Sequence, residues 1–525
     1  MRDFEKPGRS AVFAANGLCA TSHPLAAKVA LDVLQAGGTA ADAAIAGAVL
    51  LGICEPQMTG LGGDCFILLK PAGEERVIGL NGSGRAPAAL SAEALRARGL
   101  TAMPIHGIDT VTLPGAVDAF CRLNADWGRL PLADLLAPAI RYADEGVPVA
   151  PRVARDWGED ESILQGDARR FYLLDGAVPR VGQIFRAPGQ AEVLRRIARE
   201  GRAGFYEGEA AEDMIASLRA LGGGHTLDDL AATQSFYTDP VSTAYKGIEL
   251  IEHPPNGQGA TALLMLNILK HFDLTALDPL GAPRAHLEAE AAKLAYDARN
   301  RFLADPDRTT RLAHMLAPET AARLAALIDP RRALPAATPL TEAVHRDTVY
   351  ITVVDRDRMA VSLIYSIFWG FGAGLASQKY GINFQNRGAG FSLTPGHPNE
   401  AGGGKRPMHT IIPGMIAAGG RVTLPFGVMG GAYQPCGHAR FVTNLVDYGM
   451  DLQSAIDAPR CFAAPEGMKV ESGYAPETRA ALAAMGHSVI APEEPIGGAQ
   501  AIHIHDSGVL EGASDPRKDG CALGY

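Results

Sequence analysis

Two glycine-rich runs could hold a phosphate, because bare backbone N–H groups can approach an anion closely. GLGG (60–63) lies between a predicted helix and a predicted strand, whereas a phosphate loop follows a strand and opens a helix. GFGAG (370–374) follows a predicted strand, but no helix start or Lys-Ser/Thr pair comes after it. We interpret both runs as turns.

Histidine and serine motifs could carry metal or nucleophile chemistry. His503 and His505 alternate along a predicted strand, but no carboxylate or third histidine lies at matching spacing and HExxH is absent. A solvated strand face is the favoured interpretation, and no metal site is predicted. Ser83 lies in NGSG (81–84), without the leading glycine of a GxSxG nucleophile elbow.

The composition is that of a globular protein and excludes some partners. Of 525 residues, 47% are hydrophobic and 20% are charged, and the net charge is −10. A nucleic-acid footprint needs concentrated lysine and arginine, so no nucleic-acid partner is expected. The longest apolar run, residues 43–54, is too short to span a bilayer, so no membrane partner is expected.

The cysteines and the first residues indicate a cellular compartment. The seven cysteines form no CxxC pair, and several lie in apolar runs. Residues 1–17 contain no apolar signal segment. We therefore expect buried, reduced thiols and a cytoplasmic location.

Helical patterns dominate the first two-thirds of the chain and strand patterns the last third. Residues 22–36 predict a helix capped by Ser22, and Thr39 caps a second helix that reaches Cys54. Residues 110–345 are largely helical in pattern. After residue 346, the β-branched run TVYITVVD and the following MAVSLIYSIF predict a hairpin.

Three segments together resemble the γ-glutamyltranspeptidase family of N-terminal-nucleophile hydrolases, over nearly the whole chain. They are AGGTAADAAIAGAVLLGICEPQMTGLGGDCFILL (36–69), DTVYITVVDRDRMAVSLIYSIFWGFGAG (347–374) with the following GINFQNRGAGFS and KRPMHTIIP, and FGVMGGAYQP (426–435) with the terminal GASDPRKDGCALGY. The resemblance implies an α+β fold, a four-layer αββα sandwich. It also implies self-cleavage into a large subunit, 1–347, and a small subunit, 348–525, which associate as one interlocked body.

By this resemblance, Thr348 is the nucleophile and is freed by cleavage after Asp347. A threonine hydroxyl is a poor nucleophile until a base takes its proton. The α-amine of a chain that begins with threonine can serve as that base, since its ordinary pKa is about 7.7–8.0. Thr348 would first attack the carbonyl of Asp347 and later form an acyl ester with a substrate.

The remaining catalytic groups also follow from the resemblance. Ser366 stands where the family has a threonine whose hydroxyl hydrogen-bonds the nucleophile. Gly430 and Gly431 match the paired glycines whose backbone N–H groups form the oxyanion hole. Glycine suits this role because bare backbone can approach the developing charge. No cofactor is expected, since the chain supplies every group.

The family's glutamyl anchors are replaced in this sequence. Ser83 stands at the place of the arginine for the α-carboxylate, and Gly390 at that of the aspartate for the α-amine. Phe368 replaces an asparagine, and His409 and Thr410 replace paired serines. Serine cannot supply the charge of an arginine–carboxylate pair.

The substrate prediction is correspondingly open. Arg387 or Arg85 could meet a substrate carboxylate in a different way. The family default is a self-processing amidohydrolase or acyltransferase acting on glutathione or other γ-glutamyl compounds. Alternatives are hydrolysis of another small amide such as oxamate, an acyl β-lactam acylase, or a catalytically silent binding protein. The oligomeric state is not specified by the sequence.

Overall fold

The computed structural model describes residue 5, residues 8–334 and residues 348–525. Asp347, on the amino side of the predicted cleavage site, lies outside these residues. The α-helices are α1 (Pro24–Gln35), α2 (Ala40–Cys54), α3 (Ala92–Ala97), α4 (Ala116–Trp127), α5 (Leu132–Glu145), α6 (Pro151–Asp160), α7 (Asp167–Tyr172), α8 (Pro188–Glu200), α9 (Ala203–Tyr206), α10 (Gly208–Ala220), α11 (Leu227–Ala231), α12 (Gly259–Leu269), α13 (Ala282–Phe302), α14 (Leu312–Leu316), α15 (Pro318–Ala325), α16 (Gln434–Val446), α17 (Leu452–Asp457) and α18 (Pro476–Ala484). The strands are β1 (Val12–Ala14), β2 (Leu18–Thr21), β3 (Asp64–Lys70), β4 (Ile78–Gly82), β5 (Val147–Pro148), β6 (Ile184–Phe185), β7 (Phe236–Thr238), β8 (Val241–Tyr245), β9 (Ile248–Glu252), β10 (Val349–Val354), β11 (Ala360–Ser366), β12 (Pro413–Ala418), β13 (Arg421–Met429), β14 (Cys461–Ala464), β15 (Gly467–Val470), β16 (Val489–Ile490), β17 (Gly498–Ile504), β18 (Leu510–Ser514) and β19 (Cys521–Gly524).

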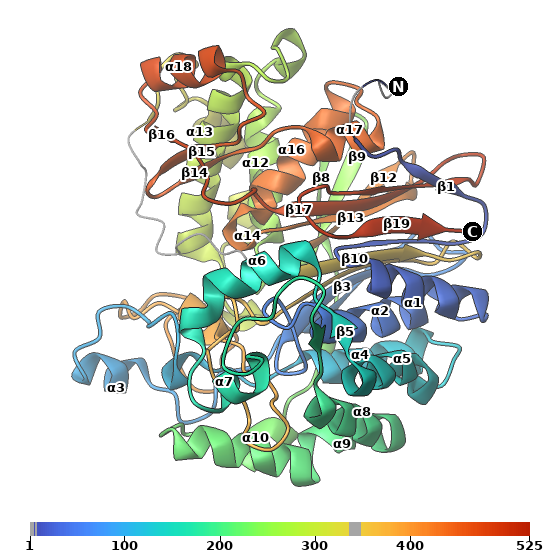
Figure 1. Cartoon of the computed structure of the whole chain (residues 1–525). Coiled ribbons are helices and arrows are strands. Elements are labelled where there is room, and N and C mark those ends of the chain that lie inside the picture. The colour runs from blue at the N-terminus through green and yellow to red at the C-terminus, as the bar shows by residue number, and fades with distance from the viewer. Residues whose placement is uncertain (1–4, 6–7, 335–347) are drawn as a thin grey trace.

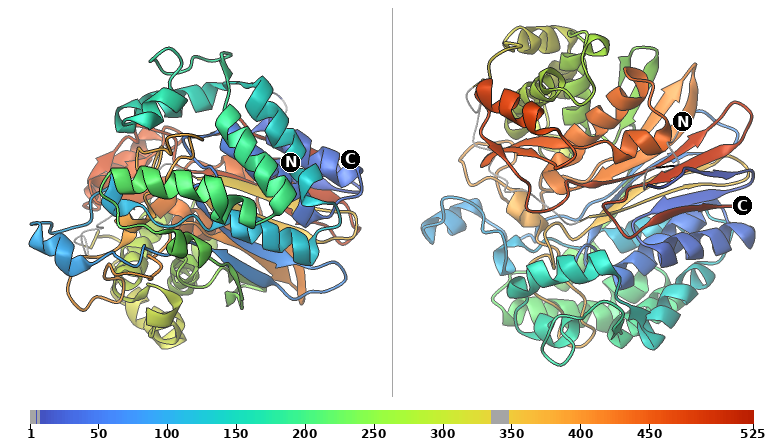
Figure 2. Two further views of the ribbon diagram at one scale, coloured as in Figure 1. Left: turned by 90° about the horizontal axis from the view of Figure 1, so that it is seen from below. Right: turned by 45° about the horizontal axis from the view of Figure 1, so that its top comes forward.

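Two seven-stranded sheets stack face to face between layers of helices (Figure 1). The first sheet has the order β1-β18-β17-β13-β12-β9-β8, and the second has the order β19-β2-β10-β11-β3-β4-β7. Helices α12, α13, α16 and α17 lie outside the first sheet, and α1, α2, α4 and α5 lie outside the second. Figure 2 shows the same layers from two further directions. The predicted four-layer αββα sandwich is confirmed.

The second sheet is buried on both faces, which explains its continuous apolar strands. In β10, Val349 and Ile351 belong to the core beneath α2. Tyr350 points the other way and joins Phe66 and Met429 between the two sheets. Because successive side chains alternate between faces, apolar residues predominate at both sets of positions.

The two halves of the chain share one core. The hairpin β10–β11, predicted from residues 348–368, lies between β2 and β3 of the preceding segment. In the first sheet, β12 pairs with β9, which also belongs to the earlier segment. Residues on both sides of position 347 are therefore hydrogen-bonded neighbours in each sheet.

Some local predictions need correction. Ser22 does not cap α1, because Pro24 occupies the first helical position and His23 is the N-cap. Ser22 instead hydrogen-bonds Glu55. Thr39 caps α2 as predicted, in a reciprocal capping box with Asp42. The segment 110–345, expected to be largely helical, also contains β7, β8 and β9, whose pairing in the sheets outweighs local helix pattern.

The seven cysteines are free, as predicted, and five of them are buried. Among the described helices, none has the length and apolar character needed to cross a membrane.

The contact between the sheets at Gly427 predicts a stability effect. A Cβ atom at Gly427 would lie 2.3 Å from a ring carbon of Tyr350. We expect Gly427→Ala to lower the free energy of unfolding by about 1–3 kcal/mol, because the two sheets must separate locally. Urea unfolding followed by circular dichroism measures this change.

Gly158→Ala is the matched control. Gly158 lies in α6, and a Cβ atom there would meet no heavy atom within 4 Å. This change should leave the stability unchanged or raise it by about 0.4–1 kcal/mol. Equal stabilities of the two variants would contradict the close packing at Gly427.

Candidate active site

Three polar residues lie side by side at one end of the second sheet. In the β10–β11 pairing, Val349 is opposite Tyr365, and the same register continued by one residue places Thr348 opposite Ser366. Ser366 in turn lies opposite Asp64 of β3. Cross-strand partners share a face of the sheet, so all three side chains are on the face toward the first sheet. Thr348, Ser366 and Asp64 are almost fully buried.

A buried arginine contacts Ser366, the middle residue of the row formed by Thr348, Ser366 and Asp64. Arg387 begins a short 3₁₀ helix, η5 (Arg387–Gly390), and is fully buried. Its Nη2 donates to Ser366 Oγ at 3.3 Å, and its Nη1 donates to Thr410 Oγ1 at 3.0 Å. The guanidinium carbon lies 3.8 Å from the ring centroid of Phe368. Four of the residues predicted from the sequence are thus in direct contact.

Phe368 has a backbone conformation that is uncommon for a large side chain. Its φ is 88°, in the left-handed region. Its N–H donates to Ser366 Oγ at 2.8 Å. This bend turns the chain directly after β11, and it places the phenyl ring against Arg387. Phe368 therefore helps to orient the arginine.

His409 reaches the other end of the row and is held as a neutral imidazole. Its Nε2 lies 3.2 Å from Asp64 Oδ2, and its Nδ1 accepts a hydrogen bond from the Ile411 N–H at 3.4 Å. Burial, with the nearby Arg387 charge as a second cause, lowers the pKa of His409 from 6.5 to about 3. A neutral ring with Nδ1 accepting must donate from Nε2 to Asp64.

Ser83 joins the same buried network, whereas Arg85 does not. Asn256 donates from Nδ2 to Ser83 Oγ at 3.0 Å, and its carbonyl accepts from the His409 N–H at 2.7 Å. The Arg85 side chain is 42% exposed and donates to the carbonyl of Gly404. Of the two arginines considered from sequence, only Arg387 lies at the row.

The predicted oxyanion-hole glycines follow directly after β13. Gly430 has φ 117° and Gly431 has φ 52°, conformations that favour glycine. A Cβ atom at Gly430 would lie 2.9 Å from the Cα of Gly497. Gln258 Nε2 donates to the carbonyl of Gly431 at 3.0 Å and to that of Thr410 at 2.6 Å. The glycine pair is therefore linked through Gln258 and Thr410 to Arg387.

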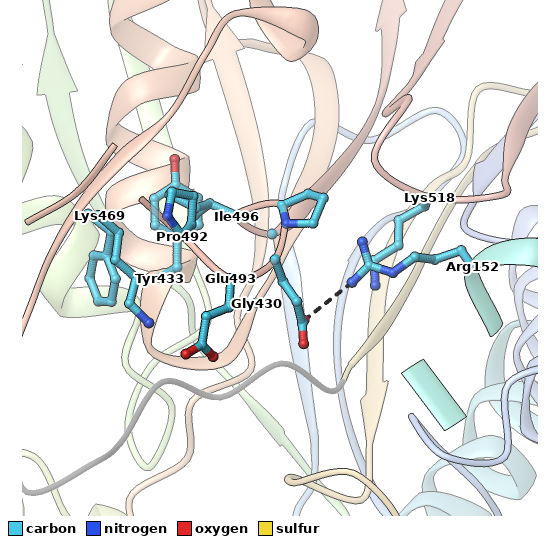
Figure 3. Close-up of a pocket in the computed structure, with 12 residues that line it drawn as sticks. Arg152, Gly430, Tyr433, Lys469, Pro492, Glu493, Ile496 and Lys518 are labelled. Atoms are coloured by element: carbon cyan, nitrogen blue, oxygen red, sulfur yellow. Dashed lines mark ion pairs between the residues drawn. The ribbon is translucent and has the colours of Figure 1, made fainter. Parts of the chain in front are cut away.

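A cavity opens beside Gly430 (Figure 3). Its wall combines the apolar surfaces of Tyr433 and Ile496 with charged side chains. Arg152 and Glu494 form an ion pair there, with 3.6 Å between Nη2 and Oε2.

A second cavity lies beside Gly390, and Met408, Phe391 and Arg299 also line it. Because Gly390 has no side chain, it presents no carboxylate to this cavity.

Sequence reasoning missed Asp64 and Gln258, both of which organise the site. Asp64 Oδ1 accepts from the N–H groups of Gly84 and Gly115 and from Gln385 Nε2, at 2.9–3.0 Å. These partners are distant in sequence, so no spacing pattern could reveal them. The only local signal for Asp64 is its place at the end of the glycine turn 60–63.

Two stacked antiparallel sheets between layers of helices are the fold of the N-terminal-nucleophile hydrolases. A sequence profile described as Gamma-glutamyltranspeptidase matches residues 26–525. The chain belongs to this family of hydrolases and transferases, as its sequence motifs predicted.

Three relatives cover nearly the whole chain. A glutathione hydrolase-like YwrD proenzyme of Bacillus subtilis is 36% identical over 96% of this chain and 97% of its own. An oxamate amidohydrolase proenzyme of Klebsiella pneumoniae is 35% identical over 97% of this chain and 98% of its own. The crystal structure of a cephalosporin acylase from Bacillus halodurans superposes with a TM-score of 0.93 at 38% identity, covering 100% of this chain and 99% of the other.

The buried neutral histidines predict a loss of stability in acid. Burial lowers the pKa of His253 to about 4, and that of His409 is about 3. Below about pH 6.5 the unfolded chain therefore binds more protons than the folded chain. Each neutral histidine contributes fully to the free energy of unfolding above pH 6.5. This contribution falls by about 1.4 kcal/mol per pH unit as the pH is lowered, down to about pH 4 for His253 and about pH 3 for His409.

Urea unfolding at several pH values between 7 and 5 tests this linkage. We expect the free energy of unfolding of His253→Gln to change less steeply with pH than that of the parent chain. The difference in slope should correspond to close to one bound proton. His271→Gln, at an exposed histidine, controls for the replacement itself. A His253→Gln slope equal to that of the parent chain would contradict the assignment.

Proposed function

We propose that the chain cleaves itself between Asp347 and Thr348 and then hydrolyses a small amide whose carboxylate lies next to the scissile carbonyl. The observation that carries this proposal is the contact of the buried Arg387 with Ser366, the cross-strand partner of Thr348. Oxamate, in which a carboxylate is bonded directly to the amide carbonyl, has this chemistry.

The reaction needs only groups of the chain. The Thr348 hydroxyl attacks the amide carbon while its α-amine takes the proton, and the carbonyl oxygen turns toward the N–H groups of Gly430 and Gly431. The α-amine returns the proton to the departing amine. Water then hydrolyses the ester by the reverse proton path. The two fragments remain associated because β10–β11 lies between β2 and β3.

The position of Arg387 limits the length of the acyl group. Its Nη2 is 3.3 Å from Ser366 Oγ, so a carboxylate bound to it would lie beside the cross-strand partner of Thr348. In a γ-glutamyl group, three carbon atoms lie between the carboxylate and the carbonyl that is attacked. Ser83 and Gly390, which stand at the family's anchors for that head group, offer it no charge. The geometry thus supports a short acyl group.

Arg387 is also suited to bind an anion by its surroundings. The nearby His409 is neutral, and Thr410 supplies a hydroxyl to the same guanidinium. A planar guanidinium can meet a carboxylate with two parallel hydrogen bonds. The oxamate amidohydrolase relative, similar along its whole length, is consistent with this substrate class.

Self-cleavage has a direct test. A denaturing gel of the purified chain should show two fragments, 1–347 and 348–525, and sequencing of the smaller one should begin Thr-Val-Tyr-Ile. Thr348→Ala should give one band, because it removes the attacking hydroxyl. Thr348→Ser, which keeps a hydroxyl, should still process. A Thr348→Ala chain that is cut like the parent would exclude Thr348 as the nucleophile.

Arg387 is expected to determine the substrate. We expect Arg387→Gln to lower kcat/KM for oxamate about 100-fold, since the substrate carboxylate loses a buried charged partner. Ammonia release, measured beside glutathione and an acyl cephalosporin, gives the rates. Self-cleavage of the variant reports that its fold is retained.

Arg85→Gln is the matched control, because the same change is made at an arginine outside the row. It should leave oxamate hydrolysis within about twofold. If the chain prefers glutathione to oxamate and Arg387→Gln does not change the rates, the proposal of a short acyl group is refuted. The proposal of self-cleavage would still stand.

A further inference from the structure

Two histidines and a glutamate lie together on the face of the first sheet that points away from the second sheet. His503 lies in β17, directly opposite Glu511 of β18. His505 follows two residues later, and its backbone N–H closes the same hairpin by donating to the Val509 carbonyl. Residues two apart in a strand share a face, so all three side chains project together.

The carboxylate that sequence spacing did not reveal is supplied across the strands. His505 Nε2 lies 2.9 Å from Glu511 Oε2, and His503 Nδ1 lies 3.9 Å from the same oxygen. One ligand atom from each residue lies within 4.8 Å of the others. Ligands of a tetrahedral zinc ion, with bonds of about 2.0–2.1 Å, are about 3.4 Å apart. Small side-chain rotations therefore bring the three atoms to coordination distance.

We propose that His503, His505 and Glu511 form a binding site for a divalent transition-metal ion, with Zn²⁺ the expected occupant. Two imidazoles and one carboxylate are a ligand set that zinc accepts, and three protein ligands leave the fourth position to water. Imidazole also suits nickel and copper, whereas magnesium and calcium prefer oxygen ligands.

The site is accessible and partly preorganised. The side chains of His503 and His505 are 36% and 34% exposed, so an ion can enter from solvent. Glu511 is only 12% exposed. Phe13 of the edge strand β1 also lies opposite Glu511 and stacks on the His505 ring, with 6.2 Å between the centroids. A bound ion would tie β17 to β18 beside the sheet edge.

A second cluster, His286, Glu290 and His487, is a poorer site. All three residues are buried, and Lys293 Nζ already donates to Glu290 Oε1 at 2.7 Å. The ammonium supplies the positive charge that a cation would bring. His286 and His487 are also hydrogen-bonded to each other at 2.8 Å. This cluster serves as an internal control.

Calorimetric titration of the untagged full-length chain with Zn²⁺, and separately with Ni²⁺, tests the proposal. We expect one equivalent of Zn²⁺ to bind at pH 7.5. His503→Ala, His505→Ala and Glu511→Gln should each weaken binding at least about tenfold, because each removes one of three ligands.

Two controls keep the result interpretable. His487→Ala, in the buried cluster, and His271→Ala, at an exposed histidine, should bind Zn²⁺ like the parent. A thermal melt with added Zn²⁺ should raise the Tm of the parent and not that of the His503→Ala/His505→Ala chain. Absence of saturable binding by the folded parent, or binding undiminished in the double variant, would overturn the proposal.

Discussion

The register of three antiparallel strands is the constraint on which the rest of the site depends. β10, β11 and β3 are paired so that Thr348, Ser366 and Asp64 end in one row. A slip of one residue in either pairing would turn a member of the row toward the helices. The register is held because both faces of the second sheet are buried, so a slip would also move apolar side chains to the wrong core.

Around this row, burial and charge act together. Arg387 is a fully buried cation whose hydrogen bonds reach Ser366 and Thr410. A buried charge is tolerated only where polar partners surround it. The same charge adds to the effect of burial in keeping His409 neutral.

The interleaving of strands explains how one chain can be cut and remain one body. The hairpin β10–β11 is paired on both sides with strands from the segment before residue 335. Cleavage of one peptide bond removes none of these ladders. The packing of Tyr350 against Gly427 joins the two sheets within the later segment itself. The core of this fold therefore does not depend on an intact peptide bond after residue 347.

The sequence by itself determined the family, because the motifs that resemble it lie in contiguous segments, and that resemblance in turn implied the sandwich. It also located Thr39 as a cap, although it misplaced the cap of α1. It could not distinguish Arg387 from Arg85, nor identify Asp64 and Gln258, nor pair Glu511 with His503. Each of these depends on strand register or on contacts between distant segments. Only the tertiary structure decided them. The chemistry of a site depends on which distant segments the fold brings together, and a local stretch of sequence does not specify this.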